Sequence, residues 1–314
     1  MSENTDMNLV AVVVTFNRFA QIRTTVTRLL EEPCNSVIVV DNGSVDGTRD
    51  WLLSQNDPRL RVVLSETNVG GAGGFARGMQ LAVSECDADW VVVMDDDGRP
   101  EPGALAAFKD MDLTEWQGAA AAVYYPDGQI CDMNRPTVNP FWHLGTFFKT
   151  LFTIGGRDAF HLVPEDYNRD IPKQIDITSF VGFFVSRQGI EMAGFPDPRL
   201  FIYGDDGLYT IGLRQEGGKI GFFPTVRFEH DCSTFTSAGE FTPIWKAYYY
   251  HRNLLFLYKA AAGWLFWPAL LLVLPKWGLK GLRQGENKRA YFRYLSWAVS
   301  DGLRGKMDRN VIEP

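Results

Sequence analysis

The sequence predicts an α/β fold with a mostly parallel central sheet, and two observations carry this prediction. Short apolar runs rich in β-branched residues alternate with segments of helical pattern through the first third of the chain. Such alternation is typical of parallel strands joined by helices that cover both faces of a sheet. The polar clusters also come directly after the apolar runs, where the carboxyl ends of parallel strands meet and ligands bind.

Four buried strands and three helices are expected in this N-terminal part. The strands are predicted at Leu9–Thr15, Ser36–Val40, Leu60–Ser65 and Trp90–Met94, and the helices at Phe19–Leu30, Thr48–Leu53 and Phe75–Ser84. The glycine-rich stretch Asn68–Gly74 is expected to form the turn before the last of these helices. Farther along, residues 127–175 read as an irregular insertion, residues 176–230 as strands with one helix, and residues 243–310 as mostly helical.

The composition is that of a globular chain. Its 314 residues are 46% hydrophobic and 22% charged, which excludes a disordered or fibrous protein. The formal net charge of -7 argues against nucleic acid as a partner. The cysteines Cys34, Cys86, Cys131 and Cys232 have no paired or zinc-ligand spacing, which favours a reducing compartment. The polar start has no apolar run typical of a secretory signal.

The C-terminal segment differs from the rest in charge. Residues 276–314 carry nine basic and four acidic side chains, and the uncharged run Ala260–Pro275 comes directly before them. This run is shorter than the ~20 residues that span a bilayer. It is either a buried helix that closes the domain or an interfacial helix on an anionic membrane, and we favour the second. Aromatic side chains expected at the headgroups are Trp277, Tyr291, Tyr294 and Trp297.

The strongest chemical motif is VVVMDDDG at Val91–Gly98. Three carboxylates at a strand end repel one another unless a cation or hydrogen bonds compensate them. Asp95 and Asp97 point to the same side of an extended chain, so both can face one ion. Their oxygen atoms suit Mg²⁺ or Mn²⁺, ions that commonly bridge a diphosphate. The alternative is a turn in which the acids cap the next helix.

Two further motifs follow predicted strands. Asp41, in VIVVDNGSVDGT, can accept a hydrogen bond from a ribose hydroxyl or a base imide, or it can form an Asx turn. The run NVGGAGGFARG, from Asn68, is neither a Walker loop nor a convincing dinucleotide fingerprint. Its glycines still allow close approach of a ligand to the backbone at a helix N-terminus. Arg77, in that helix, can meet a phosphate or a carboxylate.

The second half of the chain adds an acid pair and two histidines. Asp205 and Asp206 open a predicted helix, where a carboxylate is either a helix cap or a general base at the mouth of the site. His230, in FEHDCS, and His251, in YYYHRNLL, are by themselves more often structural residues than ligands.

Together, these motifs resemble a family 2 glycosyltransferase of the inverting GT-A type. The resemblance rests on VVVTFNR, VVDNGS, DDD and GDDGLYTIGLRQEG, and covers about residues 9–255. Within the family, TNVGGAGGFARGM followed by MDDDGRPEP resembles bacterial galactofuranosyltransferases, whereas many related rhamnosyltransferases carry Asn-Pro-Asp or a similar triplet. The resemblance implies a GT-A nucleotide-sugar-binding fold, a catalytic domain at residues 1–255 and a helical, membrane-associating extension at residues 256–314.

The resemblance also implies where the donor and its metal bind. Donor contacts are expected at Thr15, Asn17, Arg18, Asp41, Asn68, Gly70, Gly71, Arg77 and Asp96. The cofactor, Mn²⁺ or Mg²⁺, is expected on Asp95, Asp97 and His230.

The remaining implied roles lie in the second half. Asp206 would be the catalytic base, with Asp205 beside it. The segment YYYHRN resembles an element in which His251 and Arg252 approach the diphosphate. Galactofuranosyltransferases commonly place an aromatic residue before the acid pair, where this chain has Gly204.

These roles imply transfer of galactofuranose, with inversion, from UDP-galactofuranose to a hydroxyl of a polyprenyl-linked or polysaccharide glycan. The enzyme would be cytoplasmic and peripheral on the inner face of the plasma membrane. Three alternatives stay open: a dTDP-rhamnose-dependent rhamnosyltransferase, a nucleotidyltransferase, and a non-catalytic sugar-nucleotide-binding scaffold. A nucleotidyltransferase usually has a basic, glycine-rich signature after its first strand, where this chain reads TFNRFAQ. The scaffold predicts that the acid pair is dispensable.

Overall fold

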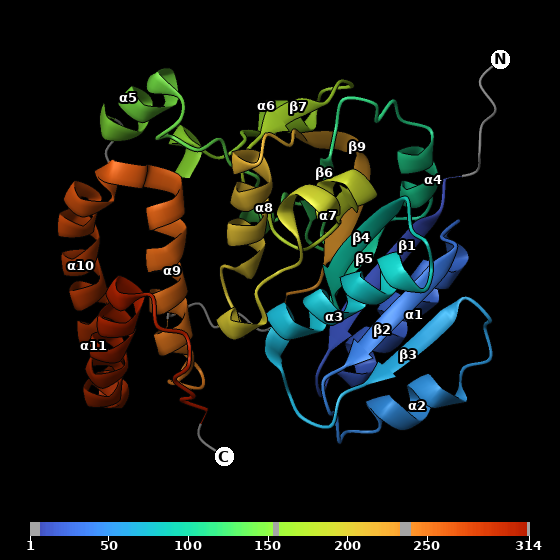
Figure 1. Cartoon of the computed structure of the whole chain (residues 1–314), viewed down its shortest axis with the longest axis horizontal. Coiled ribbons are helices and arrows are strands. Elements are labelled where there is room, and N and C mark those ends of the chain that lie inside the picture. The colour runs from blue at the N-terminus through green and yellow to red at the C-terminus, as the bar shows by residue number, and fades with distance from the viewer. Residues whose placement is uncertain (1–6, 153–156, 233–239, 313–314) are drawn as a thin grey trace.

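The computed structural model describes residues 7–152, 157–232 and 240–312, and in it three long helices stack beside a central nine-stranded sheet (Figure 1). The strands are β1 (Leu9–Thr15), β2 (Ser36–Asp41), β3 (Leu60–Leu64), β4 (Trp90–Asp95), β5 (Gly98–Pro100), β6 (Gly118–Tyr124), β7 (Lys173–Ile175), β8 (Phe183–Ser186) and β9 (Ile220–His230). The α-helices are α1 (Phe19–Glu31), α2 (Thr48–Ser54), α3 (Gly70–Ser84), α4 (Ala104–Lys109), α5 (Leu144–Phe152), α6 (Pro164–Tyr167), α7 (Arg187–Ala193), α8 (Asp205–Gln215), α9 (Lys246–Ala262), α10 (Phe266–Leu282) and α11 (Lys288–Arg304).

The sheet is parallel in one half and mixed in the other. Its order is β3-β2-β1-β4-β8-β6-β9-β5, with β7 also paired to β9. The strands β1 to β4 run parallel, as the alternation of apolar runs and helices predicted. Beyond β4 the sheet mixes directions, because β8 runs antiparallel to both β4 and β6. Every residue of β1 is buried, as expected of a strand covered on both faces.

The glycine-rich segment forms part of a helix, so the predicted turn over Asn68–Gly74 is wrong beyond its first two residues. Helix α3 already begins at Gly70. A Cβ atom on Gly74 would lie 2.5 Å from Val14 Cγ1, and one on Gly78 would lie 2.3 Å from Val12 Cγ1. These glycines therefore let α3 pack tightly on β1, a role the sequence pattern did not indicate.

The second half of the sheet brings distant residues to the end of β4. The segment 127–175 is largely irregular, with α5, α6 and β7 as its main regular elements. The region 176–230 holds two α-helices, α7 and α8, rather than the single helix predicted. The short strand β5, directly after the acid triplet, pairs antiparallel with the end of β9, which places Gly98 opposite His230.

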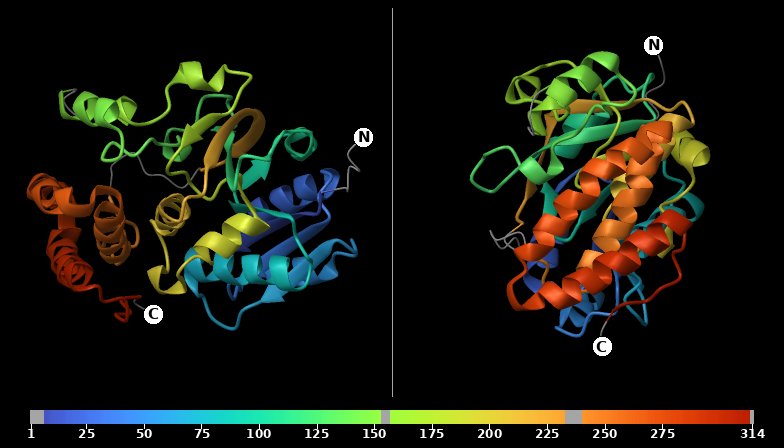
Figure 2. Two further views of the ribbon diagram at one scale, coloured as in Figure 1. Left: turned by 45° about the horizontal axis from the view of Figure 1, so that its top comes forward. Right: turned by 90° about the vertical axis from the view of Figure 1, so that its left-hand side faces the viewer.

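The helices α9, α10 and α11 pack on one another and form a hydrophobic core of their own (Figure 2). Tyr291 and Tyr294 are almost fully buried in this core and Trp277 is 7% exposed, so the expectation that they sit at a membrane surface is wrong. They fill the space between the three helices instead. Helix α9 runs without a break through residue 255, where the sequence suggested a domain boundary.

One helical run, Lys246–Leu282, is long and apolar enough to cross a membrane by length and composition. Of its apolar window, 22% is buried inside the protein. The run bends at Gly263, whose φ is +53°, so α9 and α10 form a hairpin (Figures 1 and 2). Each leg has 17 residues. At ~1.5 Å per residue a leg is about 26 Å long, less than the ~30 Å of a bilayer core.

Candidate functional site

The carboxyl ends of three parallel strands place polar side chains next to one another. In the register of the sheet, Thr15 at the end of β1 lies opposite Asp41 of β2. On the other side of β1, Val14 lies opposite Asp95 of β4. The sheet therefore gathers three of the sequence-predicted site residues at one edge, as the position of these motifs after the apolar runs predicted.

Asp96 and Asp97, which follow β4, turn toward β1 and the start of α1. The hydroxyl of Thr15 donates a 2.8 Å hydrogen bond to Asp96 Oδ2. The Arg18 guanidinium lies 3.1 Å from Asp97 Oδ2 and 3.6 Å from Asp96 Oδ1. Burial raises the pKa of Asp96 to about 7, and the positive charge of Arg18 only partly opposes this shift.

His230, the last residue of β9 in the mixed half of the sheet, contacts Asp97. Its Nε2 lies 3.1 Å from Asp97 Oδ1, and its Nδ1 lies 2.7 Å from Asn134 Oδ1. Burial alone would lower the pKa of His230, but the hydrogen bond and the charge of Asp97 raise it to about 10. The same pair holds the pKa of Asp97 below its usual value, although burial works in the other direction.

Asp95 is the exposed member of the acid triplet. Desolvation by the surrounding protein atoms and the charge of Asp97 raise the pKa of Asp95 well above its usual value, and the charge of Asp205 adds to the shift. This excess of negative charge is what a bound divalent cation would compensate. Carboxylate oxygens with one imidazole also form a suitable donor set for Mn²⁺ or Mg²⁺, so Asp95, Asp97 and His230 fit such an ion chemically.

The acid pair occupies the first turn of α8. The preceding residue, Gly204, has a φ of +73°, a backbone conformation that glycine adopts without strain. Burial raises the pKa of Asp205 to about 7, with a further contribution from Asp206. Asp206 is half-buried, and burial raises its pKa to about 6. The charge of Asp205 also contributes to the raised pKa of Asp95.

The loop before the acid pair is held by α9. Phe201 and Tyr203 have φ values of +67° and +65°, which are unfavourable for residues other than glycine. The side-chain amide of Asn253 donates hydrogen bonds to the carbonyl oxygens of Leu200, Ile202 and Tyr203, at 2.9, 2.8 and 2.8 Å. The sequence analysis assigned no role to Asn253, although this residue ends the motif YYYHRN and directly follows His251 and Arg252.

None of the described contacts of His251 and Arg252 is with the carboxylates, and their expected approach to a diphosphate stays a prediction. Both side chains are fully buried. His251 Nε2 lies 2.6 Å from the Tyr291 hydroxyl, and burial lowers the pKa of this histidine to about 3. Arg252 donates to the carbonyl oxygens of Arg199 and Leu200. Through these contacts the two residues join the helical stack to the loop before the acid pair.

Asp41 holds the following loop through a hydrogen bond three residues on, not two as in the Asx turn that was considered. Its Oδ1 accepts a 3.0 Å hydrogen bond from the Ser44 backbone N–H, and Arg49 pairs with its Oδ2 at 3.2 Å. Asn17 is similarly engaged, since its Oδ1 accepts from the Val45 backbone N–H at 2.8 Å. Both residues thus shape the loops at the edge of the sheet.

The other expected donor contacts lie along α3. Asn68 Oδ1 accepts a 2.8 Å hydrogen bond from the Gly70 N–H. A Cβ on Gly70 would lie 2.1 Å from the Phe201 carbonyl oxygen, whereas one on Gly71 meets only Phe75, at 3.8 Å. The absence of a side chain at Gly70 therefore lets the loop before the acid pair pack against the start of α3. Arg77 is exposed and lines a surface hollow with residues 195–198, so the structure does not bring it to the triplet.

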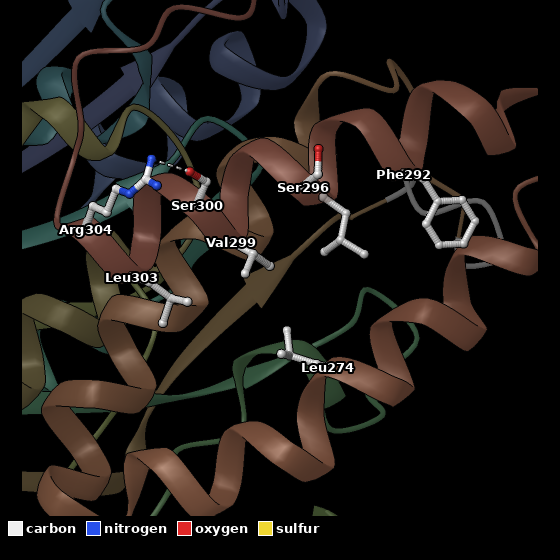
Figure 3. Close-up of a pocket in the computed structure, with 8 residues that line it drawn as sticks. Leu274, Phe292, Ser296, Val299, Ser300, Leu303 and Arg304 are labelled. Atoms are coloured by element: carbon white, nitrogen blue, oxygen red, sulfur yellow. Dashed lines mark hydrogen bonds between the residues drawn. The ribbon is translucent and has the colours of Figure 1, made fainter.

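A second hollow lies between α10 and α11 (Figure 3). It measures about 560 Å³, and most of its lining is apolar, from Leu274 on α10 to Val299 and Leu303 on α11. Arg304, which donates to Ser300 at 3.0 Å, lies at one end. Its described lining contains no carboxylate, so this groove is not the site of the acids.

Comparisons with known proteins agree with this arrangement. The family model for glycosyl transferase family 2 matches residues 10–161. The galactofuranosyltransferase GlfT1 of Mycolicibacterium smegmatis is 28% identical over 238 residues, which is 74% of this chain and 73% of that protein. An N-acetylglucosaminyl-diphospho-decaprenol L-rhamnosyltransferase of Mycobacterium tuberculosis is 26% identical over 271 residues, covering 78% and 80% of the two chains.

Among solved structures, the mannosyltransferase PcManGT from Pyrobaculum calidifontis, in complex with GDP-Man and Mn²⁺, superposes with a TM-score of 0.54. The match covers 95% of this chain and 88% of that one at 16% sequence identity. A similarity at this level of identity concerns the fold, which is the GT-A fold expected from the motifs.

Proposed function

We propose that this protein is an inverting galactofuranosyltransferase, because residues 10–161 match the family model for glycosyl transferase family 2 and the chain has the GT-A fold. Its donor is UDP-galactofuranose, and its acceptor is a hydroxyl of a polyprenyl-linked or polysaccharide glycan. The observation that carries the proposal is the meeting of the acid triplet that ends β4 with Thr15 of β1, Arg18 and His230 of β9 at the carboxyl edge of the parallel strands. Support for the donor sugar comes from the similarity to GlfT1 and from the triplet Asp-Asp-Asp.

Asp95, Asp97 and His230 are the residues we assign to the divalent cation, which when bound neutralises negative charge on the nucleotide diphosphate. Arg18 adds a fixed positive charge at the same place, since it already pairs with Asp96 and Asp97. Thr15 and Arg18 together orient Asp96 and keep it away from the open side of the site. The donor thus meets a preorganised charged surface, which is the main way such sites stabilise a leaving group.

Asp206 is the residue we assign as general base. A base works best when its pKa lies near the pH of operation, and burial has moved the pKa of Asp206 upward, to about 6. Its carboxylate accepts the proton of the acceptor hydroxyl as that oxygen attacks the anomeric carbon from the face opposite the nucleotide. One displacement of this kind inverts the anomeric centre and needs no covalent link to the enzyme.

We further propose that the enzyme works at the inner face of the plasma membrane. Trp264, Trp267 and Leu271, in and just before α10, are 80%, 62% and 75% exposed. Basic side chains on the surface of α10 and α11, including Lys276, follow this apolar stripe. An exposed apolar stripe flanked by basic groups suits an anionic lipid surface, where a polyprenyl-linked acceptor is presented.

A panel of donors tests the function. With Mn²⁺ present, the purified chain is mixed with UDP-galactofuranose, UDP-galactopyranose, dTDP-rhamnose or UDP-glucose, and donor binding and turnover are measured. Selective binding and turnover of UDP-galactofuranose is the expected result, and EDTA should abolish the turnover. Preference for dTDP-rhamnose would replace galactofuranose by the second candidate, which the similarity to the rhamnosyltransferase favours. Binding without turnover of any donor, with a panel of glycan acceptors added, would contradict the transferase.

A further inference from the structure

Two thiols lie close to the imidazole ring of His230. The thiol of Cys131 is beside Nδ1, whereas Asp97 is beside the other ring nitrogen, Nε2. Cys131 follows β6 and is fully buried, and Cys232 follows β9 and is half-buried. The sulfur atoms and one ring nitrogen of His230 all lie within 4.8 Å of one another. The Cys131 sulfur is 3.8 Å from His230 Nδ1. The spacing of the cysteines along the chain gave no sign of this cluster, because β6 and β9 are far apart in sequence and adjacent in the sheet.

The separations of these atoms suit a tetrahedral ion. Zinc binds sulfur at ~2.3 Å and nitrogen at ~2.0 Å, so its ligand atoms lie about 3.3–3.8 Å apart. The three atoms would therefore need to close by only about 1 Å. The Asn134 Oδ1 atom is hydrogen-bonded to the Cys131 sulfur at 2.9 Å and to His230 Nδ1 at 2.7 Å. An ion bound to these two ligand atoms would replace both hydrogen bonds.

The environment of His230 also matches that of a zinc ligand. A histidine that binds zinc through one ring nitrogen usually donates a hydrogen bond from the other nitrogen to a carboxylate. Asp97 occupies that position, 3.1 Å from His230 Nε2. Thiolates and imidazole form a soft donor set, which prefers zinc to Mn²⁺ or Mg²⁺.

We propose that Cys131, Cys232 and His230 Nδ1 form a binding site for a soft divalent cation such as Zn²⁺, which shares His230 with the carboxylate site for the donor's metal. Binding releases the two thiol protons and the Nδ1 proton of His230 to solvent, and leaves two thiolate–metal bonds and one imidazole–metal bond. With Nδ1 bound to zinc, Nε2 keeps the ring proton and donates a hydrogen bond to Asp97. His230 is then unable to bind the carboxylate-site metal, so zinc inhibits transfer; this second step rests on the proposed function.

Zinc binding to the full-length chain, without donor, tests the site directly. Zn²⁺ is titrated against a chromogenic chelator, and Co²⁺ is used as a spectroscopic probe because thiolate ligands give it an intense charge-transfer absorption. The wild-type chain should bind one Zn²⁺ at this site and show the thiolate band. The double variant Cys131→Ser/Cys232→Ser should lose the band and bind at this site more than about a hundredfold more weakly, since loss of outer partners alone costs up to that much.

The other two cysteines supply a matched control. Cys34 is buried and Cys86 half-buried, both outside this cluster, so Cys34→Ser/Cys86→Ser should bind zinc as the wild type does. Equal binding by wild type and the Cys131/Cys232 variant, or no stoichiometric binding by the wild type, would overturn the site. A matching melting temperature and circular dichroism spectrum verify that each variant folds.

Activity assays test the competition separately. In the presence of Mn²⁺, added Zn²⁺ should inhibit transfer by the wild type and by the Cys34/Cys86 control. Measured against its own turnover without zinc, the Cys131/Cys232 variant should resist the same zinc concentration by at least about tenfold, as expected once the thiolate ligands are gone. Equal inhibition of all three chains would overturn the competition. If none transfers sugar with Mn²⁺, the proposed function fails, while the binding titrations still decide the zinc site.

Discussion

At the scale of single residues, neighbouring carboxylates of the site differ in protonation because their partners differ. His230 and Arg18 hold the pKa of Asp97 below its usual value, against the effect of burial. Asp96, one residue earlier, is buried with less compensation, and its pKa rises to about 7. The acids could be identified from the sequence. Their charge states could not, because these depend on side chains that arrive from β1, α1 and β9.

Replacement of the proposed base tests its role. Asp206→Asn keeps the size of the side chain but cannot accept a proton, so turnover should fall by about 10²–10⁴-fold. Donor binding should change little. The measurement is kcat with saturating donor and acceptor, beside isothermal titration of the donor. Glu216→Gln, at the exposed far end of the same helix, is the control and should keep wild-type turnover. Near-normal turnover of Asp206→Asn would refute the assignment.

The pH dependence follows from the raised pKa of Asp206. The carboxylate accepts a proton only when ionised, and its pKa is about 6. Turnover should therefore be level above about pH 7 and fall toward tenfold per pH unit below the pKa. Because Asp205, with a pKa of about 7, is an immediate neighbour, the measured inflection belongs to the pair. A pH–rate profile with its acidic inflection near 4 would contradict the buried environment described for Asp206.

At the scale of elements, α9 positions the start of α8. The side-chain amide of Asn253 donates to three carbonyl oxygens in the loop that precedes the acid pair. Two residues of that loop, Phe201 and Tyr203, have positive φ values and need such support. The position of the acid pair thus depends on a helix that follows it by some forty residues along the chain.

Asn253→Ala tests this dependence. The three carbonyl oxygens lose their donor, the loop relaxes, and Asp206 moves from its working position. We expect kcat to fall roughly tenfold or more, because errors of about 1 Å in placement are costly, while donor affinity stays near normal. Asn253→Gln keeps the amide group and should recover part of kcat. A uniform loss of thermal stability with unchanged kcat would indicate support of the fold only.

The glycines of α3 allow a matched pair of substitutions. Gly78→Ala would place a Cβ 2.3 Å from Val12 Cγ1, so it should destabilise the protein by about 1–3 kcal/mol through overpacking. Gly212→Ala, on α8, meets no atom within 4 Å and should be neutral or stabilise by up to ~1 kcal/mol. Melting temperatures of the two variants would show this contrast. Equal effects would contradict the close contact of α3 with β1.

The elements differ in how far the sequence could predict them. The strands β1 to β4 and helices α1 and α2 agree with the pattern to within a residue or so, because local periodicity and burial on both faces determine them. The start of α3 was missed because glycine-rich sequence usually signals a turn, and only the contact with β1 explains a helix there. The pairing of β5 with β9, which brings His230 to Asp97, is long-range and leaves no local signal.

At the scale of the whole molecule, two exposed apolar surfaces lie on the same side as the helical stack. Helix α5 lies beside the turn between α9 and α10 in both views (Figures 1 and 2), and Phe152 on it is 76% exposed. Asn139, just before α5, donates to the Ala261 carbonyl oxygen at 3.0 Å and ties the two regions together. The sequence located the apolar run at residues 260–275, but not the contribution of the insertion to the same side.

Vesicle binding tests the proposed lipid contact. The triple variant Trp264→Ser/Trp267→Ser/Leu271→Ser removes three strongly exposed apolar groups of this stripe. Its affinity for anionic vesicles should fall by about tenfold or more, since burial of apolar area drives such binding. Leu53→Ser, an exposed leucine on α2, is the control and should bind as the wild type does. Unchanged sedimentation of the triple variant with vesicles would remove this contact from the proposal.

The continuity of α9 has a practical consequence for anyone who expresses this protein. One face of this helix carries Asn253, which supports the acid pair, and another carries Tyr248 and His251, which need α10 and α11 to cover them. A truncated gene that stops at residue 255 would leave these aromatic groups in water and end the helix only two residues beyond Asn253. Truncation there should give an aggregating product without activity, so the smallest active fragment has to include the C-terminal helices.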